Sequence, residues 1–163
     1  MSVGQAEEFQ KLGELIKGIK VAMLTTVEDD GTLHARPLAA LNYSLDENLW
    51  FFIKIDSAKV TEVDHDTRTG VTFSDTSANS YVAVTGTAQV VRDLAKAKEL
   101  WTPFARAWFP AGLDDPELAL LKVRMERAEY WTSPGKAMYL FGVAKAALTG
   151  RSTHMGEDHK LTL

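Results

Sequence analysis

The sequence contains no cysteine, and this absence excludes several classes of protein at once. Disulfide frameworks, thiolate nucleophiles and cysteine-ligated zinc or iron–sulfur centres all require that residue. The chain also lacks a basic excess, because its formal net charge at pH 7 is -4. A surface field that attracts nucleic acid is therefore not expected, and any site for an anion has to be local.

Long apolar runs are absent as well. No stretch approaches the roughly 20 apolar residues that a membrane-spanning helix needs. The first 20 residues carry Glu7, Glu8 and Glu14 in place of the apolar centre of a secretory signal. These absences predict a cytoplasmic protein without nucleic-acid or membrane partners. The length of 163 residues suits one domain over residues 1–163.

The patterns that are present are mostly those of strands. Asp30-Gly31 predicts a hairpin turn, and Gly86 inside an apolar segment predicts a bulge or bend. Strands are expected over residues 20–27, 33–43, 49–55, 70–75, 81–91 and 121–131. About six strands joined by tight turns predict a small, mainly β, antiparallel barrel with flanking helices.

Helical spacing of apolar residues predicts the flanking elements. Helices are expected over residues 6–19, 58–64, 93–109, a short stretch from 114, and 137–148. The last of these is apolar nearly all round, which favours burial or a subunit interface. The polar residues 149–163 are predicted to form a loosely ordered or surface-draped tail.

The strongest candidate for a site lies where the strand at 49–55 runs into the next helix. Ser57 is placed to cap a helix that begins at Ala58. The unpaired N–H groups and positive dipole of a helix start suit a phosphate, and the Ser57 hydroxyl and Lys59 ammonium would add to them. In the alternative, Ser57 is an ordinary helix cap and Lys59 is a solvated lysine. The Ser-x-Lys pattern by itself favours this alternative.

A second cation could join this site from the preceding strand. Side chains alternate along a strand, so His34, Arg36 and Leu38 share one face. Pro37 cannot donate a ladder hydrogen bond, which places this segment at an edge or bulge. If this strand pairs with the next one, Arg36 comes close to Ser57 and the two cations form a phosphate pocket. A surface arginine paired with a carboxylate is an equal alternative.

Other chemistry has weaker support in the sequence. Backbone groups around Leu38 and Phe52-Ile53 could border a flat ring, and Trp131 could stack on it, although tryptophan there is more often part of a core. His34 and Tyr81 are candidate acid–base groups without local support. The histidines of the tail lack the spacing of a metal site, so no metal is predicted.

Taken together, the chain resembles the FMN-binding split-barrel proteins related to pyridoxamine 5'-phosphate oxidase, in the general stress protein branch. The resemblance covers roughly Gln5 to Gly150 and depends on the order and spacing of several loose motifs. These motifs are Leu24-Thr25-Thr26, Gly31-Thr32-Leu33-His34-Ala35-Arg36-Pro37-Leu38, Leu49-Trp50-Phe51-Phe52-Ile53 with Ser57-Ala58-Lys59, Val84-Thr85-Gly86-Thr87-Ala88, and Glu129-Tyr130-Trp131-Thr132-Ser133-Pro134-Gly135.

The resemblance implies a six-stranded antiparallel split barrel and a homodimer with FMN, or alternatively FAD, at the subunit interface. Arginine, serine and lysine would hold the phosphate, the proline–leucine and phenylalanine–isoleucine pairs would line the isoalloxazine ring, and the tryptophan would approach it from the partner subunit. The implied cofactor-binding residues are Arg36, Pro37, Leu38, Phe52, Ile53, Ser57, Lys59 and Trp131.

Two departures from the oxidase limit what the resemblance implies. The oxidase has an Arg-Lys pair where this chain has Ala58-Lys59, and it carries an Arg-x-His motif after its late tryptophan that Trp131 here lacks. Pyridoxamine phosphate oxidation is therefore not predicted. The expected role is a flavin-binding stress protein that acts in redox chemistry or carries flavin. The alternatives are a flavin-dependent oxidoreductase with a small-molecule substrate and a barrel that binds haem or a deazaflavin.

Overall fold

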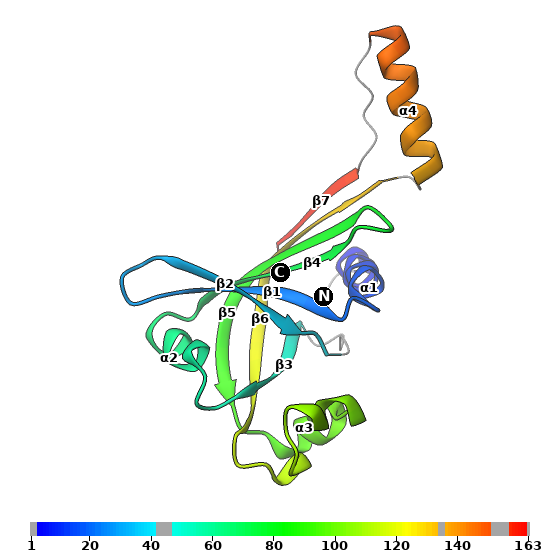
Figure 1. Cartoon of the computed structure of the whole chain (residues 1–163). Helices are drawn as coiled ribbons and strands as arrows, with labels where there is room; N and C mark the ends of the chain where they lie inside the picture. Colours follow the sequence, from blue (N-terminus) through cyan, green and yellow to red (C-terminus); the bar gives the residue numbers. More distant parts are fainter. Residues whose placement is uncertain (1–2, 42–46, 134–135, 151–156, 163) are drawn as a thin grey trace.

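The computed structural model describes residues 3–41, 47–133, 136–150 and 157–162. An antiparallel sheet curls into a half-barrel, with helices at its margins (Figure 1). Six strands follow the order β2-β1-β4-β5-β6-β3, and β7 pairs with β6 off this path. The strands are β1 Val21–Val27, β2 Leu33–Ala39, β3 Asn48–Lys54, β4 Arg68–Asp75, β5 Ser80–Val91, β6 Leu118–Thr132 and β7 Glu157–Thr162. The predicted fold class is confirmed.

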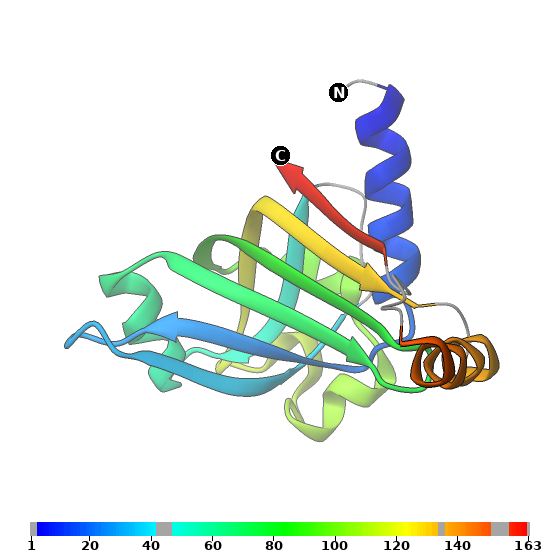
Figure 2. The ribbon, with the colours of Figure 1, turned by 90° about the horizontal axis from the view of Figure 1, so that it is seen from above.

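The α-helices are α1 Val3–Ile16, α2 Ala58–His65, α3 Leu94–Leu100 and α4 Lys136–Thr149, and short 3-10 turns η1 and η2 span Pro103–Ala107 and Gly112–Asp114. Helix α1 buries Phe9, Leu12 and Ile16 against the sheet. Figure 2 shows this helix running beside the sheet, with α2 near the opposite end of β4. Alternate residues of the strands fill the space between, so the core lies inside the half-barrel.

The predicted turn and bulge both form. Gly31 closes the β1–β2 hairpin with a φ of 84°, a conformation that suits glycine, and its N–H donates to the Glu28 carbonyl at 2.8 Å. Between Thr85 and Gly86 the pairing of β5 with β6 shifts register. A Cβ at Gly86 would lie 1.9 Å from the Arg124 carbonyl oxygen, so only glycine fits where the two backbones approach.

The expected pairing of the second and third strands is wrong. β2 pairs with β1 and β3 pairs with β6, which makes them the two edges of the sheet. Cα atoms of these edges still come within 8 Å of each other, because the sheet curls. The position of Pro37 on an edge strand is confirmed, and its missing N–H costs no ladder bond to a further strand within the described residues. The turn expected at 44–48 lies partly outside those residues.

The region after β5 also differs from the prediction. The long helix expected from Asp93 ends at Leu100, and Pro103 starts the separate turn η1. Proline cannot continue a helix because it lacks an N–H and clashes with the preceding turn. The interruption leaves Phe104 and Trp108 exposed instead of in the expected apolar stripe.

The end of the chain is more regular than expected. Part of the predicted loose tail forms β7, whose Leu161 is buried while His159 stacks on Tyr130 with ring centroids 4.9 Å apart. Helix α4, predicted correctly, extends beyond the β5–β6 ribbon and away from the barrel (Figure 1). Among the described residues, no helix combines the length and the apolar character needed to cross a bilayer.

Candidate anion-binding site

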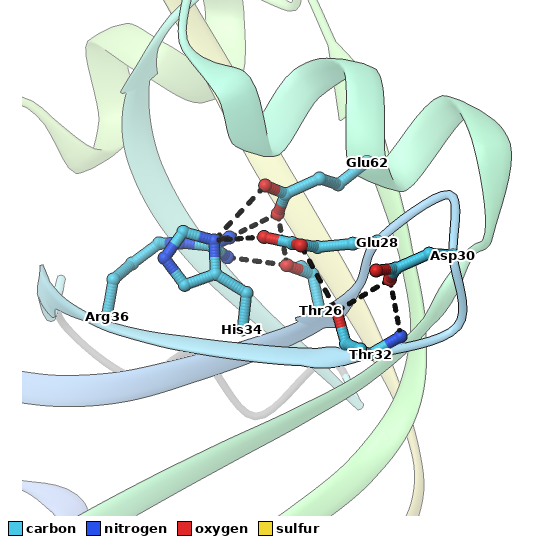
Figure 3. A network of polar contacts seen from close by, with 7 residues as sticks. All are labelled: Thr26, Glu28, Asp30, Thr32, His34, Arg36 and Glu62. Carbon is cyan, nitrogen blue, oxygen red and sulfur yellow. Dashed lines mark hydrogen bonds and ion pairs between the residues drawn. The ribbon is translucent and has the colours of Figure 1, made fainter.

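Arg36 lies at a corner between strand β2 and helix α2. Its side chain is only 15% exposed and points toward the helix (Figure 3). One guanidinium nitrogen donates to Thr26 Oγ1 at 2.6 Å, and the other pairs with Glu62 Oε2. The prediction that His34 shares this face is confirmed, because its Nδ1 lies 2.8 Å from the same guanidinium. The alternative of an arginine paired with a carboxylate is therefore realised in this structure.

Glu62 is the buried carboxylate of this corner. Burial raises its pKa, but hydrogen bonds from Thr26, His34 and Arg36, together with the charge of the arginine, outweigh that effect and leave the pKa below its usual value. The carboxylate is consequently ionised at neutral pH. Thr26 is fully buried beside it, and its hydroxyl donates to Glu62 while accepting from Arg36.

Lys59 lies one turn before Glu62 on α2 and is only partly exposed. Burial lowers its pKa, and the nearby charge of Arg36 lowers it further, while Glu62 and Asp56 partly offset these effects. Lys59 forms no hydrogen bond or ion pair with any residue that the structure describes. A partly buried ammonium beside a second cation, without a partner among the described residues, is a candidate to bind an anion.

Helix α2 begins at the same corner. Ser57 occupies the N-cap position, as predicted, but its hydroxyl donates to the Lys54 carbonyl at 2.6 Å and makes no capping hydrogen bond. Among the described residues, the first N–H groups of the helix, at Ala58 and Lys59, consequently have no side-chain acceptor. Helix starts with free N–H groups bind phosphate readily.

The other residues implied by the resemblance differ in how far they are buried. Ile53 points into the barrel core, and Phe52 packs edge-on against Trp101 with centroids 5.5 Å apart. These two can therefore face a ligand only through the backbone of edge strand β3. Pro37 is exposed on β2, and Leu38 packs partly against the core.

Trp131 belongs to a different part of the sheet. It lies near the end of β6, 39% exposed, and pairs with Tyr81 on β5 and Asp158 on β7. Among the described residues, the structure shows no contact between this tryptophan and Arg36 within one subunit. The structure thus brings together the arginine, serine and lysine of the predicted set and leaves the tryptophan apart.

The same corner contains donors that a metal could use. Oxygen and nitrogen atoms of Glu28, His34 and Glu62 lie within 4.8 Å of one another. The Arg36 guanidinium already contacts two of these three residues, so a cation of the protein occupies this position. A neighbouring hollow of about 380 Å³ is lined by four carboxylates and two other residues: Glu28, Asp29, Asp30, Ala58, Thr61 and Glu62. Its negative charge does not suit a phosphate, and Lys59 is not among its lining residues.

Sequence reasoning missed Thr26 and Glu62. Thr26 follows Ala22 and Leu24 at alternate positions of β1, so the pattern placed a hydroxyl on the buried face, where it needs a partner. Glu62 follows Lys59 by three residues, a spacing that puts both on one side of a helix. Each of the two residues therefore had a local signal, but neither signal pairs them with each other or with Arg36.

An antiparallel sheet that curls into a half-barrel with flanking helices defines the class of split-barrel proteins. Within that class, the sequence family described as pyridoxamine 5'-phosphate oxidase like matches residues 7–154. The chain belongs to this family.

The chain is also similar to individual proteins of known sequence or structure. A Neurospora crassa protein, bli-3, is 25% identical over 156 residues, which cover 89% of this chain and 75% of that protein. A structure assigned as general stress protein 26 from Jannaschia sp. CCS1 is similar in fold, with a TM-score of 0.80 and 24% identity over 97% of this chain and 99% of that chain. The general stress FMN/FAD binding protein of Xanthomonas citri has a TM-score of 0.66 and 29% identity over 77% of this chain and 89% of that chain.

Proposed function

We propose that this protein is a flavin-binding general stress protein that holds FMN by its phosphate at the corner formed by Arg36, Ser57 and Lys59. The observation that carries the proposal is Lys59, a partly buried ammonium without a partner among the described residues and with a lowered pKa beside a second cation. The Xanthomonas citri relative, which binds FMN or FAD, supports the same choice of ligand. FAD is the alternative cofactor.

The residues present fit the phosphate end of such a ligand. Lys59 supplies an ammonium, α2 supplies N–H groups at its start, and Arg36 retains N–H donors beyond those directed at its neighbours. The backbone of edge strand β3 would border the ring. Bound flavin supplies the electron-transfer chemistry, and the chain supplies position and electrostatics.

The test is a titration of the purified protein with FMN and riboflavin, followed by flavin fluorescence. Replacing Lys59 by methionine should weaken FMN binding by about 10- to 100-fold, the value of one charge-assisted hydrogen bond. Riboflavin binding should not change, because riboflavin has no phosphate. Lys11→Met, at an exposed lysine on α1, is the matched control. Equal FMN affinity in wild type and Lys59→Met would contradict the phosphate site.

The flavin is proposed to lie in a homodimer interface, with Trp131 contributed by the partner subunit. Apolar side chains of α4 support an interface: Leu140 is 65% exposed, Val143 46% and Leu148 88%. Sedimentation velocity should show a dimer with and without FMN, and Trp131→Ala should weaken FMN and riboflavin binding alike. A monomer that binds FMN with full affinity would remove the interface from the proposal.

The role of the bound flavin separates two versions of the proposal. Reduction of the flavin by NADH or NADPH at a catalytic rate would favour an oxidoreductase that acts on a small molecule. Binding without turnover would favour a redox partner or flavin carrier. Pyridoxamine phosphate oxidation has no support from the chain, because Thr132-Ser133 follow Trp131 where the oxidase motif would stand.

A further inference from the structure

The arginine of the proposed phosphate site is already bound to a carboxylate of the protein. Guanidinium groups have five N–H donors, and Arg36 directs two of them at Thr26 and Glu62. His34 Nδ1, which donates to Glu62, also lies 2.8 Å from the guanidinium. A ligand phosphate could use the remaining donors, but it would share the guanidinium with Glu62. The two anions would then lie on the same cation.

The sharing of Arg36 between Glu62 and a phosphate reduces the net positive charge that the phosphate meets. Arg36 and Lys59 contribute two positive charges to the corner, and Glu62 cancels one of them. The half-exposed Glu28 carboxylate, 3.1 Å from His34 Nδ1, adds a second negative charge. Glu62 is fixed in place, because its Oε2 contacts both Thr26 and Arg36 while Oε1 lies 3.3 Å from His34 Nδ1. It cannot move away from an incoming phosphate without losing these contacts. Two like charges that share one cation in a partly desolvated position repel each other appreciably.

We propose that Glu62 is a specificity-determining residue, whose carboxylate occupies Arg36 and lowers the preference of the site for a doubly charged phosphate monoester. The inference rests on the proposed flavin function. FMN concentrates two negative charges on one phosphate, riboflavin has none, and FAD spreads its charge over two phosphates. Glu62 therefore opposes FMN most, FAD less and riboflavin not at all.

Glu62 also has a role that explains its presence. Arg36 is largely buried, and a buried guanidinium without a carboxylate is strongly destabilising. The carboxylate thus stabilises the flavin-free fold and at the same time limits phosphate affinity. Glutamine separates these two effects, because its amide oxygen can still accept from Thr26 or Arg36 while its charge is gone.

The experiment compares wild type, Glu62→Gln and Asp64→Asn by calorimetric titration with FMN, FAD and riboflavin. Asp64 is an exposed carboxylate on the same helix, so its variant controls for the change in net charge. Glu62→Gln should raise FMN affinity by about tenfold, the effect of one repulsive charge a few ångströms away. FAD affinity should rise less, and riboflavin affinity should stay the same.

The outcomes distinguish this inference from the proposed function. A loss of FMN affinity in Glu62→Gln, or an equal gain in Asp64→Asn, would overturn the specificity role while leaving the flavin function intact. Flavin bound by neither protein would overturn the proposed function. In that case inorganic phosphate is the probe, and a larger phosphate-dependent rise of the melting temperature in Glu62→Gln would still support the carboxylate as the opposing charge. An equal phosphate-dependent rise of the melting temperature in wild type and Glu62→Gln would overturn the role of the carboxylate as the opposing charge as well.

Discussion

The centre of the β5–β6 pair and the corner between β2 and α2 are both buried, but different forces hold them. Side chains that face inward from β5 and β6 around the bulge are apolar, including Val82, Val84 and Val123, and they depend on shape. The corner buries Thr26, Glu62 and most of Arg36, which depend on one another's hydrogen bonds and charges. Substitutions in the first region should therefore change stability alone, whereas those in the second should change stability and binding together.

The largest effect is expected at the bulge. Gly86→Ala places a Cβ 1.9 Å from the Arg124 carbonyl oxygen, a backbone atom that cannot rotate away. We expect the free energy of unfolding to fall by about 3 kcal/mol or more, since overpacking against backbone forces strands apart. Urea denaturation followed by tryptophan fluorescence measures this change.

A neighbouring glycine supplies the control for that substitution. At Gly70 an added Cβ would have the Val84 carbonyl oxygen at 3.8 Å and the Thr25 Cβ at 3.9 Å, both ordinary contacts. Gly70→Ala should change the free energy of unfolding by less than about 1 kcal/mol. If both variants lost the same stability, the close approach of the backbones at Gly86 would not be the cause.

Breaking the polar corner should have a medium effect. Thr26→Val keeps the volume and removes the hydroxyl that accepts from Arg36 and donates to Glu62. The two charged groups then each lose a buried partner, which should lower the free energy of unfolding by about 1–3 kcal/mol. FMN affinity should change in the same variant, because Arg36 is no longer fixed. Stability is measured by urea denaturation and affinity by fluorescence titration.

The adjacent residue of β1 tests whether this loss comes from the hydrogen bonds. Thr25 has a hydroxyl without a hydrogen bond to the described residues, and its side chain is half-buried. Thr25→Val should leave both stability and FMN affinity nearly unchanged, since valine suits strands. Equal losses in the two variants would show that a threonine hydroxyl matters for another reason.

The sequence predicts the β5–β6 region and the corner between β2 and α2 to different extents. Strand alternation, the Asp30-Gly31 turn and the bulge at Gly86 are local signals, and all three appear in the structure. The pairing of strands is not local. A short connection favours pairing of neighbours in sequence, but β3 pairs with β6 instead, and β2 and β3 become the two edges of the sheet. Pro103 is a local signal for the end of a helix, but the apparent apolar stripe favours one long helix over residues 93–109.

Because strand pairing is not a local signal, the sequence predicted only part of the site. Arg36 and the start of α2 were identified, but their proximity was argued from a β2–β3 pairing that does not exist. They meet because α2 packs beside β1, which brings Glu62 to Thr26. Residues 26 and 62 are far apart in the chain, so no periodicity could pair them. The assignment of all eight implied residues to a flavin site stays a prediction: Arg36, Pro37, Leu38, Phe52, Ile53, Ser57, Lys59 and Trp131.

The smallest effect is expected in acid, where the contribution of Glu62 to the free energy of unfolding declines. The pKa of Glu62 lies below its unfolded value of 4.5, so the folded state binds fewer protons than the unfolded state in the range between the two values. Its contribution to the free energy of unfolding is therefore fully present above about pH 5 and declines as the pH falls through the folded pKa. Glu62→Gln has no such carboxylate to protonate.

Urea denaturation of wild type and Glu62→Gln from pH 7 to pH 3 measures this contribution as the difference between the two proteins. The difference should be constant in the upper part of the range and should shrink toward pH 3, because protonation weakens the pairing of Glu62 with Arg36. Asp66, whose pKa is lowered to about 2 by Arg68, also titrates in acid. It is present in both proteins and cancels from the difference. A difference independent of pH would mean that Glu62 stabilises the corner by shape and hydrogen bonds, and that its charge acts on the phosphate alone.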